Sequence, residues 1–150
     1  MKKFARLAFF ILAAFSIVIP KAAGDRSGLK ISYHGFADSV ELTGNRLNYS
    51  FAQQTAVPQA ATRELSAEQI KLFAEWLDRC GVFSLTGPDV LVPEPNHPGA
   101  QEYFLLLVED GDKKIELAWR GISRWNDPAR KESLDKAIEE LMKLASKLTR

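Results

Sequence analysis

The residue types that most often catalyse reactions or bind metals are few in this chain and do not cluster. Only two of its 150 residues are histidines, His34 and His97, and they fall in different predicted loops. With Glu94 or Glu102 they could supply zinc ligands, but neither an H-x-x-x-H nor a C-x-x-C spacing is present. No G-x-S-x-G motif marks a nucleophilic serine. We therefore predict no catalytic residues, no metal ion and no cofactor, which favours a binding protein over an enzyme.

The single cysteine, Cys80, cannot form an intramolecular disulfide, so packing alone must stabilise the fold. It comes at the end of a predicted helix, beside apolar residues. These surroundings favour a buried structural thiol over a nucleophile, because a reactive thiol needs a basic partner that lowers its pKa.

Two segments have the composition of a binding surface. Residues 34–38 (HGFAD) form a predicted loop with one large apolar side chain, Phe36, which would suit a partner's pocket if exposed; the alternative is an ordinary buried phenylalanine. Residues 119–125 (WRGISRW) interleave aromatic and basic side chains, which are favoured at protein interfaces and also bind sugars or anions. The alternative is that Trp119 ends a strand in the core and the arginines lie exposed in a connection. The candidate partner-binding residues are His34, Gly35, Phe36, Ala37, Asp38 and Trp125.

The first 24 residues have the three features of a secretory signal peptide. Three basic residues precede an apolar run at 7–19, and small residues at 22–24 complete a cleavage site. The run of 13 residues is shorter than the roughly 20 that span a bilayer. We therefore predict a cleaved signal peptide at 1–24 and one exported domain at 25–150, periplasmic or extracellular, with no membrane span. The alternative, an uncleaved amphipathic or buried helix, is disfavoured because the run has no polar face.

Removal of the signal peptide changes the net charge of the protein. The whole chain has 20 basic and 19 acidic residues, a net charge of +1. Four of the basic residues and none of the acidic ones fall in residues 1–24, so residues 25–150 carry 16 basic and 19 acidic residues, net −3. A nucleic-acid-binding domain normally has a clustered positive field. The charge therefore argues against nucleic acid as a partner.

Alternating apolar and polar residues predict three strands at the start of the domain. Residues 43–46 (TGNR) have the composition of a hairpin turn, since Gly44 and Asn45 tolerate positive φ, and that turn would pair Leu42 with Leu47. Residues 53–63 lack periodicity, and we expect a loop or an irregular edge there.

A helix is predicted to follow, with Ser66 and Gln69 as a capping box and Gly81 in a left-handed conformation after its end. Trp76 lies at the edge of its apolar stripe. Residues 86–99 contain four prolines and two glycines, which predicts a long surface loop.

The last part of the domain is predicted to be a hairpin and a long helix. With Asp110-Gly111 as a two-residue turn, Leu106 would face Ile115. Asp127 would cap the final helix, with proline at its first position. The strand before the turn is apolar on both sides, and its second apolar face consists of Tyr103, Leu105 and Leu107. The element order β-β-β-α-β-β-α predicts an α+β fold, a mostly antiparallel sheet of about five strands packed by two helices.

Three segments together resemble the emfourin (protealysin inhibitor) family. These are residues 31–37 (ISYHGFA), residues 64–70 (ELSAEQI) running on to 81–85 (GVFSL), and residues 103–111 (YFLLLVEDG). Their order and spacing carry the resemblance, which covers most of residues 29–119. It implies inhibition of thermolysin-like metallopeptidases by occlusion of the active-site cleft, with residues 34–38 as the binding loop.

The chain departs from that family pattern at two positions of the loop. The family loop often reads Gly-Gly-Phe-Ala-Gly, whereas His34 and Asp38 replace the first and last of these glycines. Both replacements are expected to restrict the backbone of the loop. The alternative function is a structural or assembly protein of the cell envelope that uses the apolar face formed by Tyr103, Leu105 and Leu107.

Overall fold

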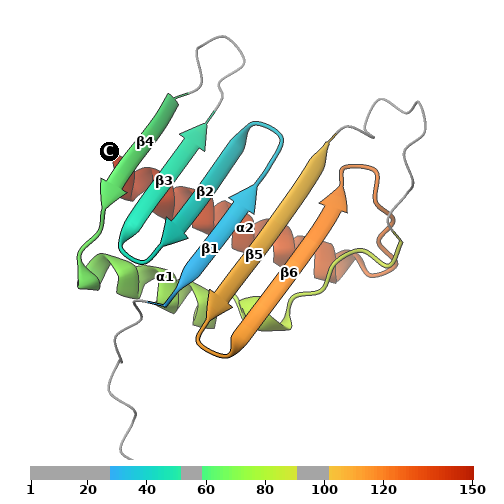
Figure 1. Ribbon diagram of the computed structural model, residues 1–150. Coiled ribbons are helices and arrows are strands. Elements are labelled where there is room, and N and C mark those ends of the chain that lie inside the picture. Colours follow the sequence, from blue (N-terminus) through green and yellow to red (C-terminus); the bar gives the residue numbers. More distant parts are fainter. Residues whose placement is uncertain (1–27, 52–58, 91–101) are drawn as a thin grey trace, which may run out of the picture.

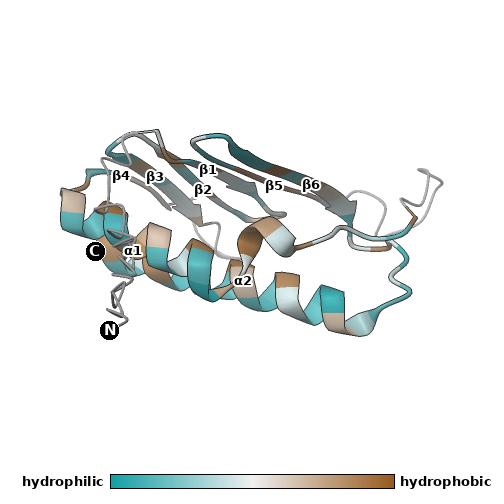
Figure 2. Cartoon of the chain, turned by 90° about the horizontal axis from the view of Figure 1, so that it is seen from below, coloured by the Kyte–Doolittle hydropathy of each residue, from teal (hydrophilic) through white to brown (hydrophobic). Residues whose placement is uncertain are grey.

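The computed structural model describes residues 28–51, 59–90 and 102–150, which form a six-stranded sheet with two helices on one face (Figures 1 and 2). The strand order is β4-β3-β2-β1-β5-β6, and all neighbours pair antiparallel. The predicted α+β class is confirmed. The elements are β1 (Lys30–His34), β2 (Asp38–Thr43), β3 (Arg46–Phe51), β4 (Gln59–Glu64), α1 (Ala67–Arg79), the 3-10 helix η1 (Val82–Ser84), β5 (Tyr103–Asp110), β6 (Lys113–Arg120) and α2 (Pro128–Thr149).

Some predictions concern segments outside the described residues. The predicted signal peptide at 1–24 and its cleavage site are among these, as is most of the proline-rich loop. Those predictions therefore stay predictions.

The sheet has one strand more than the sequence predicted. The segment at 53–63, predicted to be a loop or an irregular edge, overlaps β4, which pairs with β3 along its whole length. The helix-side positions of β4 are taken by Ala61 and Arg63, opposite Tyr49 and Leu47. Edge strands tolerate small and charged side chains, so β4 lacks the apolar alternation that identifies an interior strand.

The first hairpin has the predicted register, and the second does not. Leu42 pairs with Leu47 as predicted. In the second hairpin Leu106 pairs with Leu117 rather than Ile115.

The difference arises at the turn, which consists of Gly111 and Asp112 rather than Asp110 and Gly111. In each hairpin the first turn residue is a glycine with positive φ, 61° at Gly44 and 60° at Gly111. Asn45, in contrast, does not take positive φ. Glycine adopts this conformation without a steric penalty, so it sets where the chain reverses. The shift changes the partners but keeps each side chain on its predicted face.

The core lies between one face of the sheet and the two helices. Trp76 is fully buried, and its indole N–H donates to the carbonyl oxygen of Ala137 on α2 at 2.9 Å. The sequence placed Trp76 at the edge of the apolar stripe of α1. It is central instead, because α1 packs against α2 and its buried side chains share one core cluster with those of the sheet.

The helix boundaries follow the predicted signals. The capping box of Ser66 and Gln69 is present, and Gly81 has a φ of 56° after the end of α1. Asp127 caps α2 by accepting a hydrogen bond from the N–H of Ala129.

In the described part of the chain, the other face of the sheet carries no helix (Figure 2). Leu105 and Leu107 lie on this face, opposite His34 and Ser32 of β1, and both are half-buried. Tyr103 is 50% exposed. The apolar residues predicted on the second face of β5 are therefore left uncovered by the helices.

Candidate functional site

The predicted binding loop is a short turn between β1 and β2, at one end of the sheet (Figure 1). The N–H of Gly35 donates to the carbonyl oxygen of Asp38 at 2.8 Å, so Phe36 and Ala37 form the tip. The side chain of Phe36 is 72% exposed, more than any other large apolar side chain among the described residues. The alternative of an ordinary buried phenylalanine is therefore wrong.

Other exposed apolar side chains lie at the same end of the sheet. Phe51 ends β3 opposite Asp38 and is 38% exposed, and Tyr103 begins β5. Val90, 49% exposed, bridges Arg124 just beyond the end of β6. Phe51 and Val90 could not be identified from the sequence, because only the strand order and the bridge between Val90 and Arg124 bring them to one end of the sheet.

The departures from the family pattern do not strain the turn. His34 ends β1 and Asp38 begins β2, and neither residue has positive φ. Extended backbone is open to every residue type, so these positions do not need glycine. The expected restriction of the loop's backbone freedom by these two residues stays a prediction.

His34 belongs to a polar cluster on the helix-free face. Its Nε2 lies 3.1 Å from the hydroxyl of Ser32 and 3.3 Å from a carboxylate oxygen of Glu41. A serine–histidine–acid triad needs the acid on the opposite ring nitrogen from the serine. Because both contacts share one nitrogen, this cluster lacks the geometry of a triad.

Below the turn, two ionisable groups are shielded from water. Burial raises the pKa of the Asp38 carboxyl group. Burial, followed by the negative charges of Asp38 and Asp135, raises the pKa of the Tyr33 hydroxyl far above its usual range. Tyr33 is therefore a neutral phenol on the helix side of the turn.

Trp125 was predicted to bind a partner, and it lies in the connection from β6 to α2. β6 runs in the same direction as β1, so this connection begins at the same end of the sheet as the turn (Figure 1). Trp125 is half-buried and packs against the core. Trp119 is buried and stacks on Phe104 with ring centroids 5.4 Å apart, while Arg124 is exposed. The structure thus supports part of the alternative: Trp119 lies in the core and Arg124 is exposed in the connection, whereas Arg120 belongs to β6 and is half-buried.

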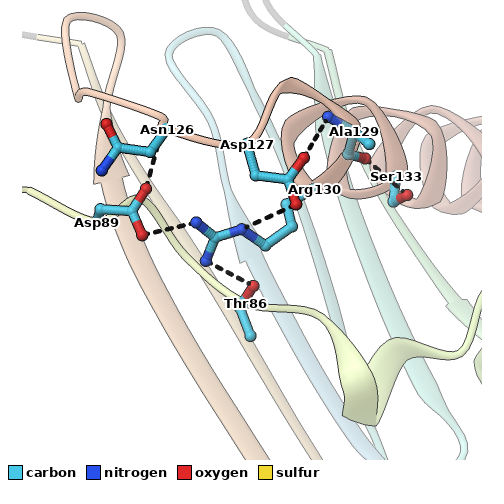
Figure 3. A network of polar contacts seen from close by, with 7 residues as sticks. All are labelled: Thr86, Asp89, Asn126, Asp127, Ala129, Arg130 and Ser133. Atoms are coloured by element: carbon cyan, nitrogen blue, oxygen red, sulfur yellow. Dashed lines mark hydrogen bonds and ion pairs between the residues drawn. The ribbon is translucent and has the colours of Figure 1, made fainter.

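A polar network that the sequence did not reveal fixes this connection (Figure 3). Arg130 of α2 donates to the carboxylate of Asp89 at 2.6 Å and to the hydroxyl of Thr86 at 3.2 Å. The other carboxylate oxygen of Asp89 accepts from the N–H of Asn126 at 2.8 Å, and Nε of Arg130 lies 3.7 Å from Asp127. The hydrogen bond from Arg130 lowers the pKa of Asp89. The network joins the segment after η1 to the start of α2.

A cavity of about 480 Å³ opens beside this network, lined by Cys80, Gly81 and residues 84–86 on one side and by Asp127 and the N-terminal part of α2, as far as Ser133, on the other. Cys80 is on its wall, half-buried, and its thiol donates to the carboxylate of Glu140 at 3.4 Å. Burial and the hydrogen bond to Glu140 raise the pKa of the thiol. A protonated thiol is a poor nucleophile, which agrees with the predicted structural role.

The predicted absence of a metal site can be examined only in part. Within the three described ranges, no group of three or more histidine, cysteine or acidic side chains is placed to hold a metal ion. His97 and Glu94 lie outside those ranges. Among the helices that the structure describes, none is long and apolar enough to cross a membrane.

Compared with protein-family models and with curated proteins, the chain shows no significant match. The resemblance to the emfourin family therefore stays a prediction from the sequence.

Proposed function

We propose that this protein is an exported binding protein whose β1–β2 turn inserts into a pocket of a protein partner. The observation that carries the proposal is the 72% exposure of Phe36 at the tip of a hydrogen-bonded turn. Aromatic side chains that enter a partner's pocket contribute much of the binding free energy at interfaces. An exposed phenylalanine at a turn is well placed for that role.

The surroundings of the turn support an interface at this end of the molecule. Phe51, Val90 and Tyr103 add exposed apolar surface at the same end of the sheet as Phe36, whereas the fifth exposed large apolar residue among those described, Leu72, lies on α1. Apolar side chains gathered at one end of a protein mark a site of association more often than side chains scattered singly. The partner's complementary surface is therefore apolar at its centre.

The partner that we propose is a thermolysin-like metallopeptidase, which the protein inhibits by occluding its active-site cleft. This part rests on the resemblance of residues 31–111 to the emfourin family and on the signal-peptide features of residues 1–24. The turn is short and joins two paired strands, so little conformational entropy is lost when it binds. A binding loop that is already held in one conformation can therefore occupy the active-site cleft of the peptidase at a low entropic cost.

A titration tests the proposal directly. The protein is purified after export from cells that express the full chain, and is added in steps to a thermolysin-like metallopeptidase. Truncation of an interface anchor costs about 2 kcal/mol or more. We therefore expect Phe36→Ala to raise the inhibition constant roughly 30-fold or more.

The matched control is Leu72→Ala, because Leu72 is an exposed apolar residue on α1, in the helix layer. It should leave the inhibition constant unchanged. Equal inhibition by the wild-type protein and Phe36→Ala would remove the turn from the interface. No inhibition of any such peptidase by the wild-type protein would refute the inhibitor function.

The second candidate function is assembly in the cell envelope through the helix-free face. The observation that favours it is that Leu105, Leu107 and Tyr103 lie on a face of the sheet left uncovered by the helices. A strand with apolar residues on both sides is usually covered on both sides. The oligomeric state of the exported protein tests this candidate.

A further inference from the structure

The shape of the β1–β2 turn depends on the absence of a side chain at position 35. A Cβ atom at this position would lie 2.5 Å from the hydroxyl oxygen of Tyr33 and 3.1 Å from its ring atom Cζ. It would also overlap a carboxylate oxygen of Asp38. The space that a side chain at position 35 would need is therefore already occupied.

Backbone conformation does not explain the glycine. The described glycines with positive φ are Gly44, Gly81 and Gly111, and Gly35 is not among them. Since Gly35 does not have positive φ, the observation that favours glycine there is the close approach of Tyr33 and Asp38.

The two neighbours differ in their freedom to move away. The carboxylate of Asp38 is the end of a short, half-buried side chain that can rotate toward solvent. Tyr33 is only 4% exposed, and it lies between Val40 of β2 and Leu106 of β5, both fully buried. Its ring cannot shift without disturbing the core, so a side chain at position 35 must displace the turn instead.

We propose that Gly35 is the positioning residue of the binding turn: it lets Tyr33 and Asp38 close beneath the turn and thereby fixes how Phe36 is presented. This inference rests on the proposed function for its consequence in binding. The geometry of the turn itself can be tested without any partner.

The test compares Gly35→Ala with the wild-type exported protein. The first measurement is amide hydrogen exchange at residue 35, whose N–H bonds to the carbonyl oxygen of Asp38. The second is the rate of chymotrypsin cleavage after Phe36, because a displaced turn fits a protease better than a fixed one. We expect the exchange and cleavage rates each to rise at least about tenfold, since protection follows the population of the closed turn.

Three further variants make the result specific. Gly28→Ala is the matched control, because Gly28 has no positive φ and a Cβ there meets nothing within 4 Å; it should change neither rate. Phe36→Ala should leave exchange at residue 35 unchanged. Tyr33→Phe combined with Gly35→Ala removes the hydroxyl oxygen that the added Cβ atom would meet at 2.5 Å, and it should restore part of the protection. If Gly35→Ala does not fold, this double variant is compared with the wild-type protein, and a smaller rise in both rates is expected because Cζ of residue 33 and the carboxylate of Asp38 remain close to the added atom.

The outcomes separate this inference from the proposed function. Gly35→Ala with the exchange and cleavage rates of Gly28→Ala would overturn the positioning role, whatever the protein binds. If the wild-type protein inhibits a thermolysin-like metallopeptidase, Gly35→Ala should inhibit it at least about tenfold less well although Phe36 is intact. If the wild-type protein does not inhibit, the proposed function fails while the two rates still decide the role of Gly35.

Discussion

Asp38 carries a charge that the folded protein partly shields from water. Its pKa is raised by burial, so the folded state binds a proton more readily than the unfolded chain. Stability is therefore lost as the pH rises above about 4 and through the pKa of the folded state. The ionised carboxylate is the less favourable form beneath the turn.

We expect Asp38→Asn to stabilise the protein at neutral pH, because it removes this charge while it keeps the shape of the side chain. The gain should be less than about 1 kcal/mol, since Asp38 is only half-buried and solvent screens its charge. Urea unfolding at pH 7 and pH 3 measures it. The gain should disappear at pH 3, where Asp38 is protonated in both states, and an equal gain at both pH values would contradict this explanation.

Only some residues of the site could be predicted from the sequence. Phe36 was identified because the sequence itself shows a large apolar residue between glycine and alanine in a predicted loop. The roles of Tyr33 and Gly35 could not be predicted, because they depend on the Tyr33 side chain of β1 occupying the space that a side chain at position 35 would need. Trp125 was selected because residues 119–125 interleave aromatic and basic side chains. Its packing against the core could not be predicted from the residues next to it in the sequence.

Local signals predicted the secondary-structure elements well wherever a particular residue was required. Ser66 with Gln69 and Gly81 placed both ends of α1, as Asp127 placed the start of α2. The segment that contains β4 was predicted only as a loop or an irregular edge, because a strand with one neighbour needs few apolar residues. The helix ends were predicted, and β4 was not, for the same reason. Only positions that are buried, or that need a particular backbone conformation or cap, restrict which residue type can occupy them.

The contact between Asp89 and Arg130 joins the segment after η1 to α2. It could not be predicted from the sequence, since the two residues are 41 positions apart. Arg130 holds the pKa of Asp89 below its usual range. The pKa shift of Asp89 is opposite in direction to that of Asp38. Its contribution to stability is therefore present at neutral pH and is lost as the pH falls through the pKa of the folded state.

We expect Asp89→Asn to lower the thermal midpoint at pH 7, because Arg130 and the N–H of Asn126 lose a charged acceptor. The difference from the wild-type protein should shrink as the pH falls below about 4, where Asp89 of the wild-type protein also becomes protonated. Thermal unfolding followed by circular dichroism between pH 3 and pH 7 measures this. A difference that stays constant over that range would show that the ion pair is not its source.

At the scale of the whole molecule, the sheet is covered by helices on one face only in the described part of the chain (Figure 2). If the protein assembles in the cell envelope, Leu105 and Leu107 on the helix-free face are expected to contact a second copy of the protein. In that case sedimentation equilibrium of the exported protein should show an oligomer, which Leu105→Thr with Leu107→Thr weakens at least about tenfold. A monomer at all accessible concentrations would exclude self-assembly through this face.

The two proposals share Tyr103 but otherwise use different residues, so they can be tested separately at Phe36 and at Leu107. The turn and the exposed apolar residues around it lie at one end of the sheet, whereas Leu107 lies further along β5 on the helix-free face. Substitutions at Phe36 should leave the oligomeric state unchanged. Substitutions at Leu107 should leave peptidase inhibition unchanged.

The most direct test of the proposed function is the stoichiometric titration of a thermolysin-like metallopeptidase with the exported protein. Binding through the turn predicts that residual activity falls linearly to zero near one equivalent. It also predicts that Phe36→Ala abolishes the sharp end point while Leu72→Ala preserves it. Full peptidase activity at a large excess of the wild-type protein would contradict the inhibitor function, and an unchanged end point with Phe36→Ala would contradict the role of the turn.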